Sequence, residues 1–183
     1  YYNKDFRTIE YWDGKFWRQV DNTTRSGRGV FTGGEVPSRT STIDYITIAS
    51  QGNALDFGSL VTGVLRATSG CSSNTRGMIC SGDSPSSRIV DIQYLTIQSA
   101  GNSIDYGDLT AGSRGTSSVS SSTRGICKIG STPSYPGTID AFEIATLGNA
   151  IDFGDQVTAS AASGGASNPT RGIFGGGYNP SDM

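Results

Sequence analysis

Residues 76–107 read RGMICSGDSPSSRIVDIQYLTIQSAGNSIDYG, and the main features of this stretch occur again on both sides of it. Its opening Arg-Gly pair recurs at steps of 48, 48 and 47 residues, beginning at Arg28. The Gly-Asn pair and the Asp-aromatic-Gly triplet near its end recur at steps of 49 and 47. A fixed period in this range is typical of a repeat protein, so the sequence predicts three full repeats and a partial fourth.

Each repeat is predicted to contain four short strands. The Arg-Gly segment, with small apolar residues and glycines, is typical of an inner strand where backbones crowd together. The next segment alternates apolar and polar residues, as at Ile46 and Ile48, which indicates a half-buried antiparallel strand. The Gly-Asn pair is predicted to make the following turn, because such pairs tolerate positive φ. A third strand carries Leu55 and Phe57, again in alternation, and a variable Ser/Thr/Gly stretch is expected to be an outer edge strand or loop.

Four antiparallel strands in about 48 residues are typical of one blade of a β-propeller, so the sequence predicts an all-β, β-propeller-like fold. Residues 7–20 contain a predicted hairpin with a two-residue Asp13-Gly14 turn. This hairpin either completes a short fourth blade with the C-terminal strand or docks onto another chain, because open sheet edges are rarely left uncovered. The predicted organisation is a closure or docking segment at 1–23 and a repeat domain at 24–183, with repeats at about 24–71, 72–119, 120–166 and a partial repeat at 167–183.

Composition excludes several classes of function. The 183 residues include 26 glycines and no histidine, and the formal net charge is −2. The basic residues are scattered, so a nucleic-acid surface is not expected. Catalysis by histidine and zinc sites with histidine ligands are excluded. No run is long and apolar enough for membrane insertion, and we expect no metal and no cofactor. Cys127 is predicted to be a small core residue, and Cys71 and Cys80 are not expected to form a disulfide framework.

The repeated arginines are the main candidates for ligand binding: Arg28, Arg76, Arg124 and Arg171. If they lined a channel, they would form a positive ring for an anionic sugar or phosphate. The alternative is structural, with each arginine bonded to an aspartate or a main-chain carbonyl of the next repeat. Tyr45 and Tyr94, on the polar face of the alternating strand, are candidates for stacking on sugars. Asp56, Asp105 and Asp152 lack the acidic density of a calcium loop and are expected to cap turns or pair with arginine.

The N-terminal segment is rich in aromatic residues, and its predicted interface residues are Tyr11, Trp12, Phe16 and Trp17. These side chains are expected to pack in an interface with another subunit or, alternatively, to stack on sugar rings. No unique pair of carboxylates stands out from the nearly symmetric repeats, so the chain is not expected to be an enzyme.

Two parts of the sequence resemble known proteins. The phrase Glu10-Tyr-Trp-Asp-Gly-Lys-Phe-Trp resembles a hairpin common in fibre and virion proteins of tailed phages. The segments Thr42–Tyr45, Gly52–Gly58 and Thr170–Tyr178 resemble repeats in structural proteins of marine tailed bacteriophages. The Gly-Gly pair after two apolar residues resembles the kelch-repeat signature, although the distal tryptophan of kelch blades has no counterpart here.

The resemblance implies a structural virion protein, located in the extracellular particle as part of a tail fibre or surface appendage. It also implies other virion proteins as partners, assembly as a homo-oligomer and possible attachment to a host-surface glycan. The alternative is a carbohydrate-binding, lectin-like adhesion module, in which repeated weak sites would give multivalent binding.

Overall fold

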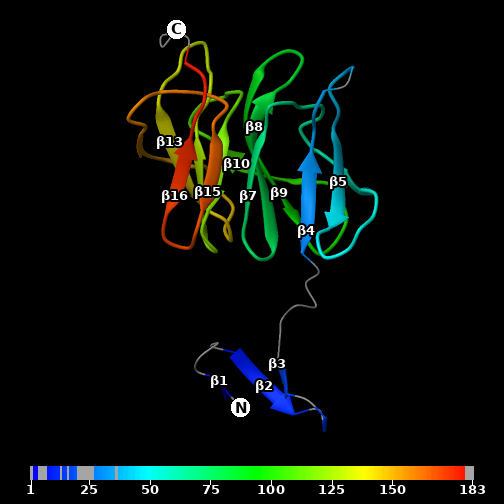
Figure 1. Ribbon diagram of the computed structural model, residues 1–183. Helices are drawn as coiled ribbons and strands as arrows, with labels where there is room; N and C mark the ends of the chain where they lie inside the picture. The colour runs from blue at the N-terminus through cyan, green and yellow to red at the C-terminus, as the bar shows by residue number, and fades with distance from the viewer. Residues whose placement is uncertain are drawn as a thin grey trace.

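A computed structural model describes residues 2–3, 8–12, 14–15, 17–19, 27–35 and 37–179. The regular structure in these ranges is β-strand throughout, and every pairing between strands is antiparallel (Figure 1). Glycine, β-branched and aromatic residues favour this outcome because they are poor helix formers but fit pleated strands. Within these residues there is no helix long and apolar enough to span a membrane.

Strands β4 to β16 form four sheets that follow one another along the chain. The first sheet has three strands, the second and third have four, and the fourth has two. In chain order the strands of these sheets are β4 (Arg28–Thr32), β5 (Thr42–Thr47) and β6 (Leu55–Ser59); β7 (Ser69–Ser72), β8 (Arg76–Asp83), β9 (Arg88–Thr96) and β10 (Ile104–Asp108); β11 (Ser117–Ser120), β12 (Arg124–Lys128), β13 (Thr138–Glu143) and β14 (Ile151–Asp155); β15 (Gly164–Ser167) and β16 (Gly172–Gly175).

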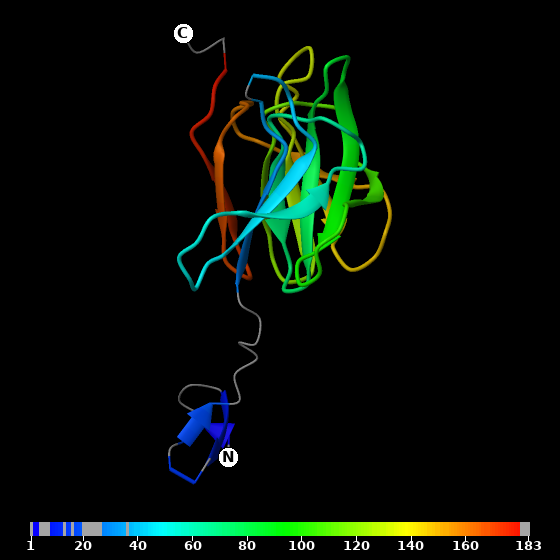
Figure 2. The ribbon, with the colours of Figure 1, turned by 90° about the vertical axis from the view of Figure 1, so that its right-hand side faces the viewer.

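The predicted all-β fold built from roughly repeated four-stranded sheets is confirmed. Each full sheet is a simple meander, as in the second sheet, whose strand order is β10-β9-β8-β7. The described strands do not form a closed propeller ring, because the extensive contacts between sheets run from β7 to β11 and from β11 to β15 and β16, and none of that extent joins the first sheet to the fourth. The four sheets follow one another across the molecule in Figure 1, and Figure 2 views them from the side of the first sheet.

The order of strands within a sheet differs from the prediction. In the second, third and fourth sheets the variable Ser/Thr/Gly stretch pairs with the Arg-Gly strand that follows it, so the Arg-Gly segment forms the second strand and not the inner one. In the first sheet the Arg-Gly segment forms the first described strand, β4. The variable strands β7, β11 and β15 lie side by side where the sheets meet. The residues of these strands vary between repeats but are small, and strands can approach this closely only with small side chains.

The Asp-aromatic-Gly triplets form β-bulges. The predicted alternation, with Leu55 and Phe57 on the same face of the strand, was therefore wrong. The register between β5 and β6 shifts after Asp56, and Gly58 follows with φ +149°. The extra residue turns the Phe57 ring into the core, where it is 2% exposed, whereas Leu55 remains 58% exposed. Glycine is needed after the aromatic residue because other residues rarely adopt this φ.

Two hydrophobic cores fill the spaces between neighbouring sheets. The first contains Ile43 and Phe57 from the first sheet, with Ile79 and Leu95 from the second. The second core joins the second sheet to the third, and its members are Met78, Cys80, Ile92, Tyr106, Leu109, Cys127, Ile129, Phe142, Ile144 and Ala150. Successive residues of β8 thus point into different cores, so this strand is buried on both faces. Cys127 is a buried core residue as predicted, and all three cysteines are free thiols.

The N-terminal strands form a separate small sheet. Its strands are β1 (Tyr2–Asn3), β2 (Thr8–Trp12) and β3 (Trp17–Gln19), and none pairs with a described strand of the repeats. Trp12 pairs with Trp17, whereas a two-residue Asp13-Gly14 turn would pair Trp12 with Lys15, so the register differs from the predicted one. Of the predicted interface residues, Trp12 is 54% exposed. Phe16 and the side chains of Tyr11 and Trp17 lie outside the described part of the structure.

Candidate functional site

Two of the repeated arginines join neighbouring sheets. Arg28 Nη1 donates a hydrogen bond of 2.8 Å to the carbonyl of Ile97, at the end of β9 in the second sheet. Its guanidinium also stacks 4.6 Å from the centre of the Tyr45 ring. The second repeat uses the same contacts, since Arg76 Nη1 donates to the Ile144 carbonyl at 2.8 Å and stacks over Tyr94 at 4.5 Å. Both contacts match the structural alternative that the sequence left open.

The predicted sugar-stacking tyrosines are engaged by these contacts. One face of each ring carries an arginine, and each ring also meets an aromatic residue edge-on. Tyr45 lies 5.8 Å from Phe57, and Tyr94 lies 6.5 Å from Tyr106, measured between ring centres. Stacking of a sugar on the arginine-covered face would require the arginine to move.

Arg124 and Arg171 are arranged differently from the first two arginines. Alanine stands at 141, where the earlier repeats have tyrosine, and Arg124 Nε donates instead to Glu143 Oε1 at 3.0 Å. Both partners of this ion pair are about half exposed, so the pair contributes little stability. Arg171 is exposed at the start of the two-stranded fourth sheet. The structure therefore divides the predicted ring of four arginines into two partly buried joints and two surface residues.

The Gly-Asn pairs also join sheets, and the prediction that they form hairpin turns was wrong. The turn after β9 closes earlier, where the Ser99 N–H donates to the Thr96 carbonyl. Gly101 instead donates its N–H to the Phe57 carbonyl at 2.7 Å, and Asn102 Oδ1 accepts the Ser59 N–H at 3.0 Å. A Cβ on Gly58 would lie 2.4 Å from the Gly101 carbonyl oxygen, so only glycine permits this approach.

The same hydrogen bonds occur between the second and third repeats. Gly148 N–H donates to the Tyr106 carbonyl at 3.1 Å, and Asn149 Oδ1 accepts the Asp108 N–H at 3.0 Å. A Cβ on Gly107 would lie 2.5 Å from the Gly148 carbonyl oxygen. Local pattern analysis missed this role because the partners are more than 40 residues apart, although the recurrence of asparagine itself was a usable signal.

Serine hydroxyls connect the strands at which the sheets meet, and we refer to these contacts as the serine ladder. Ser120 Oγ donates to the Ser72 carbonyl at 2.8 Å and accepts the Ser72 N–H at 3.2 Å. Ser167 Oγ makes the matching bonds to the Ser120 main chain, at 2.8 and 3.3 Å. The ladder therefore satisfies edge-strand groups that would otherwise need another strand or water.

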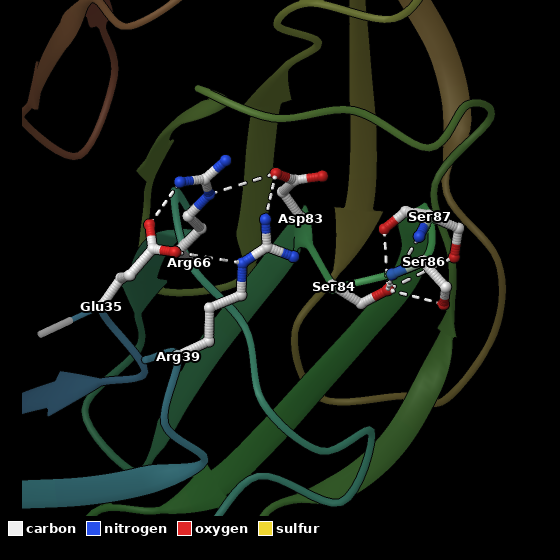
Figure 3. A network of polar contacts seen from close by, with 7 residues as sticks. All are labelled: Glu35, Arg39, Arg66, Asp83, Ser84, Ser86 and Ser87. Carbon is white, nitrogen blue, oxygen red and sulfur yellow. Dashed lines mark hydrogen bonds and ion pairs between the residues drawn. The ribbon is translucent and has the colours of Figure 1, made fainter. Parts of the chain in front are cut away.

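A network of four charges ties the first sheet to the second (Figure 3). Asp83 Oδ2 accepts hydrogen bonds from Arg39 Nη2 and Arg66 Nε, both at 3.1 Å. Glu35 bonds to Arg66 on the other side and pairs with Arg39 Nε at 3.7 Å. These carboxylates raise the pKa of Arg66 through hydrogen bonds, Glu35 contributing most. Two positive and two negative groups balance, so the network holds loops together without attracting a further charge.

Two buried charged side chains lie in the third sheet, and each is hydrogen-bonded to hydroxyl groups of other segments. Lys128 is 1% exposed, and its Nζ donates to Ser160 Oγ at 2.9 Å and Ser163 Oγ at 2.7 Å. Burial lowers the pKa of this lysine. Asp140 is fully buried and accepts hydrogen bonds from the main chain and the hydroxyl of Thr110, each at 2.8 Å. Burial raises the pKa of Asp140.

The end of the repeat row lacks the cover that the equivalent surfaces of the earlier repeats have. Between the third sheet and β16 lies a cavity of about 630 Å³, lined in part by Arg124, Phe153, Asn168 and Arg171. Phe153 is 59% exposed, whereas Phe57 and Tyr106, its counterparts in the earlier repeats, are 2% and 4% exposed. We refer to this surface, formed by β12 to β14 and β16, as the open face. It is the candidate functional site because the Phe153 ring, unlike the equivalent rings of the earlier repeats, is uncovered and lies in a cavity with two arginines.

In the ranges that the structure describes, no three cysteine, aspartate or glutamate side chains are placed to hold a metal ion. No protein-family model matches the sequence, and no curated protein matches it.

Proposed function

We propose that the chain is a non-enzymatic structural protein of a tailed-phage virion, contributing to a fibre or surface appendage by assembly of its β-repeats. The resemblance of the repeats and of the N-terminal phrase to phage structural proteins supports the biological setting. The observation that carries the proposal is that Arg28 and Arg76 bond across sheets. Polar residues that recur in each repeat therefore hold neighbouring repeats together, and a protein that assembles from repeats needs such contacts.

The partners that fit this role are other virion proteins and further copies of the chain. The row of sheets is open at both ends, and exposed sheet edges and apolar faces favour association with another chain. A propeller-like closed arrangement would then arise in the assembly. The place of action would be the extracellular particle.

Light scattering of the full chain, beside a shortened chain that starts at residue 24, tests the assembly role. We expect a defined oligomer for the full chain and folded, smaller species for the shortened one, because the N-terminal sheet is the proposed docking segment. A full chain that stays monomeric at all concentrations, and whose specific antibody does not label purified phage particles, would refute the proposal.

Carbohydrate binding is the second candidate function, and the open face favours it. The exposed Phe153 ring lies in a cavity that also contains Asn168 and Arg171, a combination that suits stacking on a sugar and bonding its hydroxyls. A glycan array probed with the wild-type chain and with Phe153→Ser tests this function. Selective binding that the substitution abolishes would establish a lectin role, and an array without signal would remove it.

A further inference from the structure

The open face carries one half of the interface that joins the other repeats. In both internal interfaces, the glycine after the aromatic residue is approached by the next repeat, with a Cβ position 2.4 or 2.5 Å from a carbonyl oxygen. The equivalent Gly154 has φ +141° but no atom within 4 Å of its Cβ position. The backbone is thus already shaped for a neighbour that the described chain does not supply.

The main-chain groups beside Gly154 also match those that bond the next repeat elsewhere in the chain. Phe153 carbonyl and Asp155 N–H correspond to the pair in the first repeat that bonds Gly101 and Asn102. Neither Phe153 nor Asp155 makes such a bond with any described residue of another repeat. Arg124 also lacks the crossing bond to a carbonyl that Arg28 and Arg76 make.

The fourth sheet has a free edge next to these groups. It contains only β15 and β16 in the described chain, whereas the second sheet continues with β9 and β10. The cavity of about 630 Å³ lies at this place, between β16 and the apolar side chains of Ile126, Ile139 and Phe153. An unpaired edge beside an apolar surface is the setting in which an extended segment adds to a sheet.

We infer that the open face binds an antiparallel β-hairpin with alternating apolar residues in its first strand and a Gly-Asn pair before its second. The inference rests on the proposed assembly function and names the kind of partner. The first strand pairs with β16, and its final carbonyl accepts a hydrogen bond from Arg124. The glycine N–H donates to the Phe153 carbonyl, the asparagine oxygen accepts the Asp155 N–H, and apolar side chains cover Phe153.

A second intact copy does not fit this place as well as a hairpin does. The chain offers its own Gly52-Asn53 pair on β5–β6, but β5 is paired with β4. Strand β4 holds the same position in its repeat as β16 holds in the fourth, since both continue an Arg-Gly segment. An arriving copy would therefore have to displace β16, whereas a two-stranded hairpin fills only the vacant positions.

A peptide of residues 90–109, joined end to end by an added Asn-Gly turn, serves as the probe. It contains the Ile97 carbonyl and the Gly101-Asn102 pair, and the added turn reduces the ordering cost of an isolated hairpin. Titration into the full chain up to about 1 mM is followed by calorimetry. We expect saturable binding, and about fivefold weaker binding for the same peptide with Asn102→Ala, which removes one hydrogen-bond acceptor.

Protein variants locate the binding surface. Phe153→Ser is expected to weaken binding about tenfold, because apolar area is no longer buried against the peptide. Ile104→Ser, which removes a similarly exposed apolar side chain from the second sheet, is expected to leave binding unchanged. Absence of binding at 1 mM, or equal binding to Phe153→Ser, would overturn the inference.

Light scattering of the same variants separates the remaining outcomes. If the wild-type chain self-associates and Phe153→Ser alone dissociates it, the open face takes a second copy and the hairpin inference is wrong. If the chain assembles normally in both variants but does not bind the peptide, the assembly function stands and only this inference fails. A chain that binds the hairpin but never assembles would support the inference while refuting the assembly function.

Discussion

At the scale of single residues, the same amino acid has different roles at equivalent positions. Arg76 combines a hydrogen bond to the Ile144 carbonyl with stacking over Tyr94. Arg124 has only an exposed ion pair with Glu143. The difference follows from two neighbours, because Ala141 replaces the tyrosine and no described strand brings a carbonyl to Arg124.

Substitution of these arginines should therefore have unequal effects on stability. We expect Arg76→Ala to lower the free energy of unfolding by about 2 kcal/mol, through loss of a charged donor and of the cation–π contact. Arg124→Ala should change it by less than about 0.5 kcal/mol. Urea unfolding of both variants measures the difference, and equal losses would contradict the assignment of Arg76 as a joint.

Lys128 makes stability depend on pH with a definite sign. Burial lowers its pKa in the folded chain below the value of 10.5 in the unfolded chain. Between these two pKa values the unfolded chain binds more protons, so the contribution of Lys128 to the free energy of unfolding rises with pH. The rise ends once the unfolded lysine also deprotonates.

We expect Lys128→Met to remove this contribution. The free energy of unfolding of the wild type, minus that of the variant, should increase from neutral pH toward about pH 10.5. Comparison with a variant is needed because burial also raises the pKa of Tyr106, which acts in the opposite direction at high pH.

At the scale of elements, the bulged strands β6, β10 and β14 share a shape but differ in their neighbours. Gly107 and Gly154 have nearly the same φ, +145° and +141°. Only Gly107 is closely approached by the next repeat, through the Gly148 carbonyl. Comparison of these two glycines therefore distinguishes the effect of backbone strain from the effect of crowding between repeats.

Alanine substitution at the two glycines should show this separation. Both variants carry the strain of positive φ, which costs about 1 kcal/mol or more. Gly107→Ala should cost about 2 kcal/mol beyond Gly154→Ala, since its Cβ would lie 2.5 Å from a main-chain oxygen. Thermal unfolding of the two variants measures the difference, and equal midpoints would show that the repeats separate easily.

The elements were predictable from the sequence to the extent that they depend on local pattern. The alternating strands around Ile43 and Ile92 were predicted correctly, and both residues are fully buried. The bulge at Phe57 was not predicted, because period-two analysis assumes an unbroken register. The Gly-Asn bonds and the serine ladder join residues more than 40 positions apart, so no local window contains both partners. The open face follows from the absence of such partners and could not be seen before the contacts were known.

At the scale of the whole molecule, stability should decrease toward the fourth sheet. Strand β8 lies between two cores and is mostly buried, whereas β15 and β16 are almost entirely exposed. In a row of repeats, each sheet gains stability from its immediate neighbours, so an end sheet with one neighbour and two strands has the least support.

Hydrogen exchange should reveal this gradient. We expect the amides of β15 and β16 to exchange at least about tenfold faster than those of β8 and β9, because local opening needs little exposure of buried surface. Mass spectrometry of peptides from each strand measures the rates. Uniform protection across all four sheets would instead indicate a single cooperative unit.

The contacts between sheets depend on position within a repeat and not on which repeat supplies them. Arg28 meets the carbonyl of Ile97 and Arg76 meets that of Ile144, two partners at equivalent positions. Removal of residues 76–123 as one block would bring Ile144 to the place of Ile97 and leave the bonding scheme complete. Unequal crossing-over in a gene of this kind can therefore add or delete whole repeats without harming the fold, whereas an insertion of half a repeat would disrupt two sheets at once. Selection on such a gene would act on length in steps of one repeat.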